Sequence, residues 1–161
     1  MTKRITISTL DAMKASGDKF VMITAYDATF ARLASEAGAE TILVGDSLGM
    51  VLQGHETTIP VSLDAMVYHT ECVARAKPRS LIVADLPFMS FSNSDDALHA
   101  STQLMQAGAQ MVKLEGGTWL SDSINRLVER GVPVCAHLGL TPQSVNVFGG
   151  YRVQGRTPKE A

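Results

Sequence analysis

The chain has only two cysteines and no long apolar run, and both absences exclude classes of protein. Cys72 and Cys135 lie far apart and have no histidine partner at metal-ligand spacing, so we expect a reducing, cytoplasmic compartment. Both thiols are predicted to be small, buried apolar side chains. No uncharged stretch approaches the roughly 18 residues that a membrane span needs. The N-terminus, MTKRITISTLDAMK, lacks the apolar centre of a signal peptide.

Basic clusters and phosphate-binding glycine motifs are also missing. The net charge is -2, and no Lys/Arg cluster or aromatic-basic interleaving occurs, so neither nucleic acid nor a membrane is an expected partner. No glycine-rich fingerprint follows the first predicted strand, and the pattern G-x-x-x-x-G-K-[ST] is absent. The 161 residues are 45% hydrophobic, which is enough for a sizeable core.

Three apolar runs, residues 42–46, 81–85 and 111–115, each end on a carboxylate. The runs have the length and continuous apolar character of fully buried parallel strands. An acid at the end of such a strand contributes nothing to a core, but parallel pairing brings neighbouring strand ends together. The sequence therefore predicts a cluster of Asp46, Asp85 and Glu115 where α/β enzymes place their chemistry.

Helical patterns alternate with these runs. Helices are predicted over residues 7–16, 29–37, 63–74, 94–105 (with Ser94 as N-cap) and 120–128, further strands over 21–26 and 133–138, and a loop over 49–60. A weak repeat, EAGAETILVGD, QAGAQMVKLEG and ERGVPVCAHLG, reads helix end, glycine, strand and polar tip. Repeated βα units imply right-handed crossovers and a parallel sheet.

Polar residues end all five predicted strands: Asp27, Asp46, Asp85, Glu115 and His137. An open doubly wound sheet is the default for five strands. Polar residues at the ends of all five consecutive strands instead favour a barrel, in which every strand end faces one shared opening. An eightfold barrel usually needs about 250 residues. We therefore expect residues 1–161 to be a single domain that supplies about the first five βα units of a (β/α)8 barrel. Thr157 and Pro158 resemble the start of a sixth helix, so the chain is expected to end before the barrel closes.

Several long motifs identify a family. They are ITAYDATFA (23–31), VGDSLGMVLQGHETTIPV (44–61), YHT (68–70), ADLPFMS (84–90), AGAQMVKLEGG (107–117) and CAHLGLTPQSVNVFGGYRVQGR (135–156). In this order they closely resemble the ketopantoate hydroxymethyltransferase family. The resemblance implies a TIM barrel of the phosphoenolpyruvate/pyruvate type, Mg2+ dependence and a large homo-oligomer, typically a decamer. The implied reaction transfers a hydroxymethyl group from 5,10-methylenetetrahydrofolate to 3-methyl-2-oxobutanoate, giving ketopantoate for pantothenate biosynthesis.

The resemblance also assigns roles to residues. Asp46 and Asp85 match the Mg2+ ligands, and both adjoin the substrate; Glu115 matches a third acid at the metal, acting directly or through water. Ser47 matches a group that hydrogen-bonds the keto acid, and Lys113 a cation that contacts it. The family's general base is a glutamate after the sixth strand, beyond Ala161, so no catalytic base is assigned within this chain.

The residues suit this chemistry. Removing a proton from carbon 3 of a keto acid places negative charge on oxygen, which a hard cation stabilises. Mg2+ usually takes one or two protein carboxylates and keeps positions for substrate and water. Lys113 and Glu115 are two apart and so share one face of a strand. A buried ammonium such as that of Lys113 would be costly without an anion beside it.

Simpler interpretations apply to other polar residues. Asp27 is predicted to be structural, because a single aspartate at a strand end usually caps a helix or forms a turn. His137 is predicted to contact the substrate, but a bond to a neighbouring acid or a purely structural role stays open. The remaining histidines, His55, His69 and His99, are predicted to be solvated or packing residues. The loop 149–152 is either a mobile lid or an ordinary connection.

Two alternatives to the transferase remain. One is a Mg2+-dependent lyase or mutase of the same barrel superfamily that acts on a small 2-oxo acid. The other is a non-catalytic half barrel that binds metal or joins an assembly without turnover.

Overall fold

A five-stranded, all-parallel sheet forms the centre of the computed structural model, which describes residues 3–157. Its strands are β1 (Met22–Thr24), β2 (Thr41–Val44), β3 (Leu81–Asp85), β4 (Met111–Glu115) and β5 (Val134–His137). They follow one another in the order β1-β2-β3-β4-β5, and each neighbouring pair is parallel. A doubly wound sheet reverses its strand order at a switch point, whereas a barrel wall does not. The observed order is that of a barrel wall.

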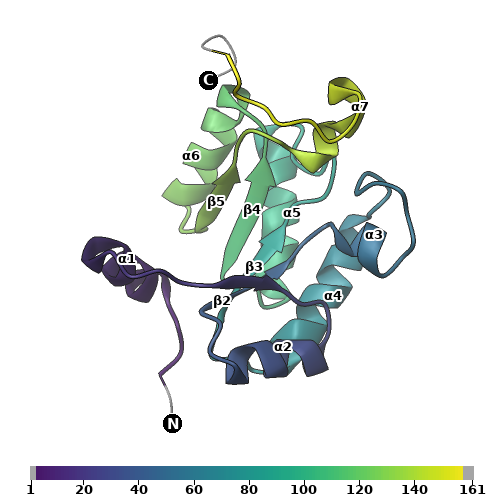
Figure 1. Ribbon diagram of the computed structural model, residues 1–161. Helices are drawn as coiled ribbons and strands as arrows, with labels where there is room; N and C mark the ends of the chain where they lie inside the picture. The colour runs from purple at the N-terminus through teal and green to yellow at the C-terminus, as the bar shows by residue number, and fades with distance from the viewer. Residues whose placement is uncertain (1–2, 158–161) are drawn as a thin grey trace.

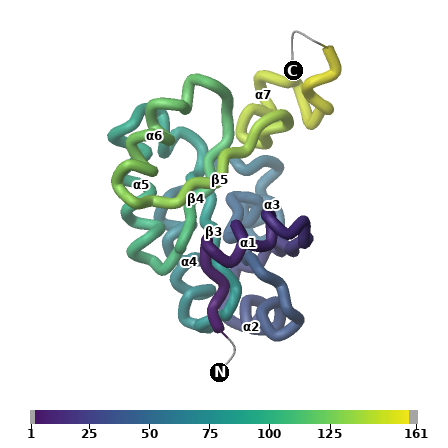
Figure 2. The backbone as a smooth tube through the Cα atoms, turned by 90° about the vertical axis from the view of Figure 1, so that its left-hand side faces the viewer, coloured from purple at the N-terminus to yellow at the C-terminus, as the bar shows by residue number. Residues whose placement is uncertain are grey.

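Helices connect the strands in the expected βα alternation (Figure 1). They are α1 (Ile7–Ser16), α2 (Ala28–Glu36), α3 (Leu48–Val51), α4 (Leu63–Arg75), α5 (Ser94–Gln106), α6 (Ser121–Glu129) and α7 (Val145–Phe148), with the 3-10 turns η1 (Thr118–Leu120) and η2 (Pro142–Ser144). The N-terminal segment and the α7 end of the chain lie at opposite ends of the fold in both views (Figures 1 and 2).

The two faces of the sheet have separate apolar contacts, because side chains alternate along each strand. One face packs against the surrounding helices and includes Ile42, Ile82 and Val112. The other face carries Leu81 and Val83 and is covered by the N-terminal segment through Ile5, Ile7 and Leu10. Burial on both faces explains why the strands read as continuous apolar runs.

Helix starts follow local capping chemistry. Asp27 caps α2, because its Oδ1 accepts hydrogen bonds from the backbone N–H groups of Thr29 (2.8 Å) and Phe30 (2.9 Å). Its predicted structural role is confirmed. The prediction of Ser94 as N-cap is wrong: Asn93 is extended and its carboxamide oxygen accepts from two backbone N–H groups, while Ser94 is already helical.

Three other predictions need correction. The predicted loop over 49–60 begins inside a short helix, α3, which four residues form directly after Ser47. β1 has three residues instead of six, and all three are exposed at the edge of the sheet. Cys72 and Cys135 are partly exposed rather than buried, the second because β5 is the opposite edge strand. The start of a sixth helix at Pro158 lies outside the described residues.

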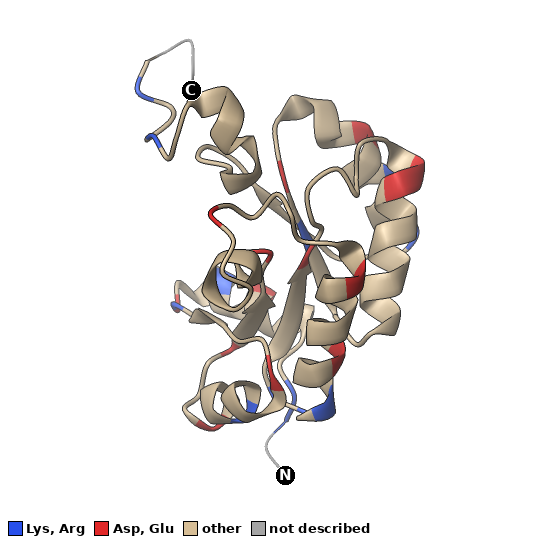
Figure 3. Cartoon of the chain, turned by 90° about the vertical axis from the view of Figure 1, so that its right-hand side faces the viewer, with Lys and Arg blue, Asp and Glu red and all other residues tan. Residues whose placement is uncertain are grey.

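The surface agrees with the balanced composition. Lys/Arg and Asp/Glu segments are interspersed over the side of the chain that Figure 3 shows. Within residues 3–157, no helix has both the length and the apolar character required to cross a membrane.

Candidate active site

The predicted acids meet at the C-terminal ends of neighbouring strands. Asp85 and Glu115 are the last residues of β3 and β4, and Asp46 follows β2 by two residues. All three are buried, with 4%, 4% and 5% exposure for Asp46, Asp85 and Glu115. Ionised groups are buried this deeply only when they are paired or bind a cation.

Lys113 supplies the positive charge in this cluster. It lies opposite Asp85 in the β3–β4 register, and its Nζ forms an ion pair with Asp85 Oδ1. Glu115, two residues further on the same face, lies opposite His137 of β5. The predicted shared face of Lys113 and Glu115 is therefore confirmed.

Asp46 and Asp85 are directly connected. The backbone N–H of Asp46 donates a 3.3 Å hydrogen bond to Asp85 Oδ2. Gly45 makes this approach possible, because a Cβ there would lie 2.8 Å from Ser47 Oγ and 3.3 Å from Asp85 Oδ2. The glycine of the VGDS motif thus leaves room for both the carboxylate and the serine hydroxyl.

Gln143 joins the carboxylates and was missed by sequence reasoning. Its side-chain Nε2 donates to Asp46 Oδ2 (2.8 Å) and to the carbonyl of Leu86 (2.9 Å), and its backbone N–H donates to Glu115 Oε1 (2.6 Å). The amide is buried and reaches the cluster from η2, after β5. The only signal in the sequence was that Gln143 lies in LTPQS, inside one of the family motifs. Nothing in its local sequence indicated a contact with Asp46, which lies 97 residues earlier in the chain.

Ser47 and His137 also face the cluster. The Ser47 hydroxyl lies 3.0 Å from the Tyr26 hydroxyl, a partner that the sequence did not indicate. The Tyr26 carbonyl in turn lies 2.8 Å from His69 Nδ1, so His69 holds this segment by a hydrogen bond. His137 Nδ1 lies 3.2 Å from Glu115 Oε2. This nitrogen atom is buried and makes no well-aligned hydrogen bond to any described residue, although the His137 side chain as a whole is partly exposed.

Burial shifts the protonation of the cluster. It raises the pKa of Asp85 to about 7, opposed by the charge of Lys113 and reinforced by that of Asp46. Burial likewise raises the pKa of Asp46 and of Glu115, and lowers the pKa of His137 with help from the positive charge of Lys113. For Lys113, burial alone would lower the pKa, but the charge and hydrogen bond of Asp85, together with the charges of Glu115 and Asp46, outweigh burial and the pKa is raised. Three carboxylates against one ammonium leave an excess of negative charge when all are ionised.

The donor set suits a hard divalent cation. Asp46 and Asp85 are adjacent carboxylates, the oxygen ligands that Mg2+ prefers in ones and twos. Within residues 3–157, however, no three His, Cys, Asp or Glu side chains form a preassembled ligand group. Glu115 is instead engaged by Gln143 and adjoins His137. Protein ligation by Asp46 and Asp85 alone, with Glu115 acting through water, fits this arrangement better than three direct ligands.

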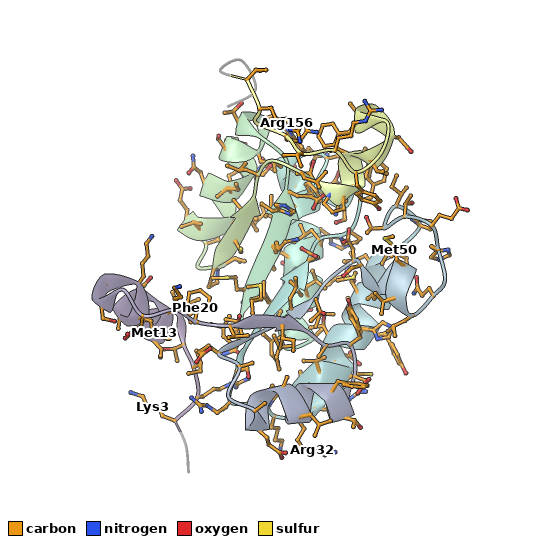
Figure 4. All side chains as sticks on the ribbon, viewed as in Figure 1. Lys3, Met13, Phe20, Arg32, Met50 and Arg156 are labelled. Atoms are coloured by element: carbon orange, nitrogen blue, oxygen red, sulfur yellow. The ribbon has the colours of Figure 1, made fainter. Side chains whose placement is uncertain are left out.

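A larger open cleft, about 1060 Å3, lies at the opposite ends of the strands and contains none of the predicted site residues. It is lined by the C-terminal ends of α2 and α4, including Arg32, which Figure 4 labels. The acid cluster therefore does not lie in this larger cleft.

Fold and site together define a chain of the (β/α)-barrel class with acids at the C-terminal ends of consecutive strands, the position of the reacting groups in barrel enzymes. The model of the family described as ketopantoate hydroxymethyltransferase matches residues 4–161. The chain belongs to this family, as the sequence motifs predicted.

Curated relatives carry the name 3-methyl-2-oxobutanoate hydroxymethyltransferase. One from Marinobacter nauticus is 62% identical over 157 residues, which cover 98% of this chain and 60% of that protein. One from Burkholderia vietnamiensis is 63% identical over 153 residues, covering 95% of this chain and 56% of that protein. The chain thus spans somewhat more than half the length of these relatives.

Solved structures with similar folds include two enzymes. Phosphonopyruvate hydrolase, in a complex with oxalate and Mg++, matches with a TM-score of 0.68 at 18% identity, covering 88% of this chain and 53% of that chain. A 2,3-dimethylmalate lyase of the PEP mutase/isocitrate lyase superfamily matches with a TM-score of 0.62 at 17% identity, covering 88% and 54%. At this identity the likeness shows the fold alone, and it confirms the predicted barrel type, of which this chain supplies about half.

Proposed function

We propose that the protein transfers a hydroxymethyl group from 5,10-methylenetetrahydrofolate to 3-methyl-2-oxobutanoate and so forms ketopantoate. Carbon 3 of the keto acid loses its proton and bonds to the methylene carbon, and water supplies the hydroxyl. Both carbon–nitrogen bonds between the methylene group and the folate break, and the two nitrogens take up the proton from carbon 3 and one proton from water, which releases tetrahydrofolate. The observation that carries the proposal is the buried cluster of Asp46, Asp85 and Lys113, set in the motifs VGDS, ADLP and KLEGG of a chain of this family.

Asp46 and Asp85 are the proposed Mg2+ ligands, with Glu115 acting through water. A bound divalent cation supplies charge stabilisation for a keto oxygen that gains negative charge. Gln143 orients Asp46 and Glu115, because its side chain donates to Asp46 and its backbone N–H donates to Glu115. Two buried carboxylates next to one ammonium leave the negative charge that a divalent cation matches.

Lys113, Ser47 and His137 are the proposed contacts to the keto acid. The Lys113 ammonium, already paired with Asp85, offers positive charge to the anionic substrate. The Ser47 hydroxyl is oriented by Tyr26 and can donate to a keto-acid oxygen. The His137 side chain is 32% exposed and lies beside Glu115, so its imidazole ring can contact a substrate oxygen next to the cluster.

A lyase or mutase acting on a small 2-oxo acid is the second candidate. The fold likeness to phosphonopyruvate hydrolase and 2,3-dimethylmalate lyase favours it, but that likeness extends to the barrel alone. Dependence on methylenetetrahydrofolate separates the two candidates, since only the transferase consumes it.

We further propose a cytoplasmic homo-oligomer, a decamer as the family resemblance implies. Analytical ultracentrifugation checks the assembly, and a monomer at micromolar concentration would contradict it.

Because the chain spans 60% of the Marinobacter nauticus relative, activity is best measured in a completed enzyme. This completed enzyme is a chimera in which residues 1–161 are fused to the part of the Marinobacter nauticus relative that lies beyond the match.

We expect the Mg2+ affinity of this enzyme to fall about tenfold from pH 8 to pH 6. The pKa of Asp85 is about 7, so the metal binds the free carboxylate above that pH and must displace a proton below it. Affinity is therefore full at high pH and is lost as the pH falls through 7. Isothermal titration calorimetry with MgCl2 measures it, and an unchanged affinity between pH 6 and 8 would contradict this assignment.

Lys113→Met should raise the pH at which Mg2+ affinity is half lost to a value above 7, because the ammonium is the main group that lowers the pKa of Asp85. The Michaelis constant for 3-methyl-2-oxobutanoate should also rise. Thermal stability should stay equal or increase, since a buried ammonium is removed and the partner carboxyl can take up a proton. Lys19→Met, at an exposed lysine, is the control. A large loss of stability with an unchanged Michaelis constant would identify a purely structural ion pair.

A further inference from the structure

An aromatic pocket of about 150 Å3 adjoins the carboxylate cluster. Its walls come from the segment after β3 and the segment after β4, and η2 closes one side. The residues that matter for the argument are Met89, Phe91, Glu115, Gly116, Trp119 and Gln143. Glu115 and Gln143 belong to both the pocket and the cluster, so a ligand here lies next to the proposed keto-acid site.

Trp119 is fixed on one side and open on the other. Its ring stacks on Phe91 with centroids 6.2 Å apart and planes 10° apart, and Phe91 is only 4% exposed. A Cβ on Gly116 would lie 2.8 Å from Trp119 Cζ2, so the indole rests against backbone that has no side chain. Trp119 itself is 62% exposed. Exposing the open face of the indole to water is unfavourable, and ring stacking with a flat ligand would bury that face.

The opposite wall is also apolar and strained. Met89 has φ +63°, a left-handed conformation that non-glycine residues rarely adopt and that concentrates at binding sites. Its flexible thioether side chain is 61% exposed, and Phe88 beside it is exposed as well. Thioether and aromatic groups adapt to flat apolar ligands.

We propose that this pocket binds the pterin ring of the one-carbon donor, with Trp119 as the stacking platform. The inference rests on the proposed function, which requires a second substrate whose methylene carbon reaches the keto acid. Sites for drug-sized ligands usually occupy about 300–1,000 Å3, so 150 Å3 takes one ring system and leaves the rest of the folate outside. Glu115, Gln143 and Ser144 supply polar groups for the amide and amine edge of a pterin.

The kinetic test uses Trp119→Leu in the completed enzyme. Loss of a stacking platform should raise the Michaelis constant for methylenetetrahydrofolate by roughly five- to 100-fold. The Michaelis constant for 3-methyl-2-oxobutanoate should stay within about twofold, as should Mg2+-dependent exchange of its carbon-3 proton, which needs no folate. Phe30→Leu, at an exposed aromatic on α2 outside the pocket, is the matched control.

A pair of adjacent glycines provides a second test that keeps the tryptophan. Gly116→Ala should displace the indole and raise the folate Michaelis constant, whereas Gly117→Ala should not, because its Cβ meets Trp119 only at 3.7 Å, an ordinary contact. Thermal melts identify any variant that fails to fold.

Binding is also visible directly, because Trp119 is the single tryptophan of the 161 residues. All the residues that line the pocket in this structure lie between Phe88 and Ser144, so the 161-residue chain contains them. Tetrahydrofolate should therefore shorten the Trp119 fluorescence lifetime saturably, and the lifetime is insensitive to light absorbed by the ligand. An unchanged lifetime, or an unchanged folate Michaelis constant in Trp119→Leu, would overturn the pterin assignment. If the completed enzyme exchanges the keto-acid proton but forms no ketopantoate, the proposed function fails instead.

Discussion

Asp46→Asn in the completed enzyme should reduce Mg2+-dependent ketopantoate formation by at least about 100-fold, since the change removes a proposed metal ligand and even indirect metal contacts are worth 10- to 100-fold. The substitution conserves volume, and the remaining oxygen can still accept the hydrogen bond from Gln143. What is lost is the negative charge beside Asp85. Steady-state kinetics over a range of MgCl2 concentrations, with a circular dichroism melt, measure the effect.

Asp27→Asn is the matched control, because Asp27 also follows a parallel strand but caps α2 instead of facing the cluster. Asparagine caps helices as well as aspartate does, so activity and melting temperature should both be retained. Unchanged activity and unchanged Mg2+ dependence in Asp46→Asn would remove Asp46 from the metal site.

The 161-residue chain alone should exchange the carbon-3 proton of 3-methyl-2-oxobutanoate only at the background rate, even with Mg2+. A positioned general base contributes about 10^2- to 10^4-fold, and the family resemblance predicts that the base glutamate is not among these 161 residues. Asp46 and Asp85 are assigned to the metal, and Glu115 accepts a 2.6 Å hydrogen bond from Gln143. The completed enzyme should exchange faster by that factor. Proton NMR in deuterium oxide follows both proteins.

Fast exchange by the isolated chain would show instead that a base lies within it. Glu115 would be the first to test, because burial raises its pKa and makes it more basic, and His137 the second. Glu115→Gln and His137→Gln would then identify the group. Background exchange in both proteins would favour the non-catalytic interpretation.

Local sequence signals predicted the strands and acids well. β3 and β4 have the predicted bounds, because each is a continuous apolar run with a charged residue at its end. Parallel pairing predicted that the strand ends lie together, whereas the register that places Asp85 opposite Lys113 and Glu115 opposite His137 is known only from the structure. The helix Ile7–Ser16 also matches its prediction, with Thr6 as its cap.

Contacts between distant segments could not be predicted. Gln143 reaches Asp46 only because η2 folds back over the strand ends, and no periodicity encodes that path. The Trp119–Phe91 stack joins the segments after two different strands, and neither aromatic was singled out from the sequence. Asn93 and Ser94 are both good capping residues, so only the backbone conformation decides between them. The metal and substrate roles came from family motifs, since geometry alone shows a buried charge cluster.

The most direct test of the central claim is product analysis with the completed enzyme. It is incubated with MgCl2, 3-methyl-2-oxobutanoate and methylenetetrahydrofolate that carries carbon-13 in its methylene group, and the products are analysed by mass spectrometry. The account predicts ketopantoate with the label in its new hydroxymethyl carbon, and no product when EDTA replaces MgCl2. Absence of labelled ketopantoate from a folded, Mg2+-loaded enzyme would contradict it.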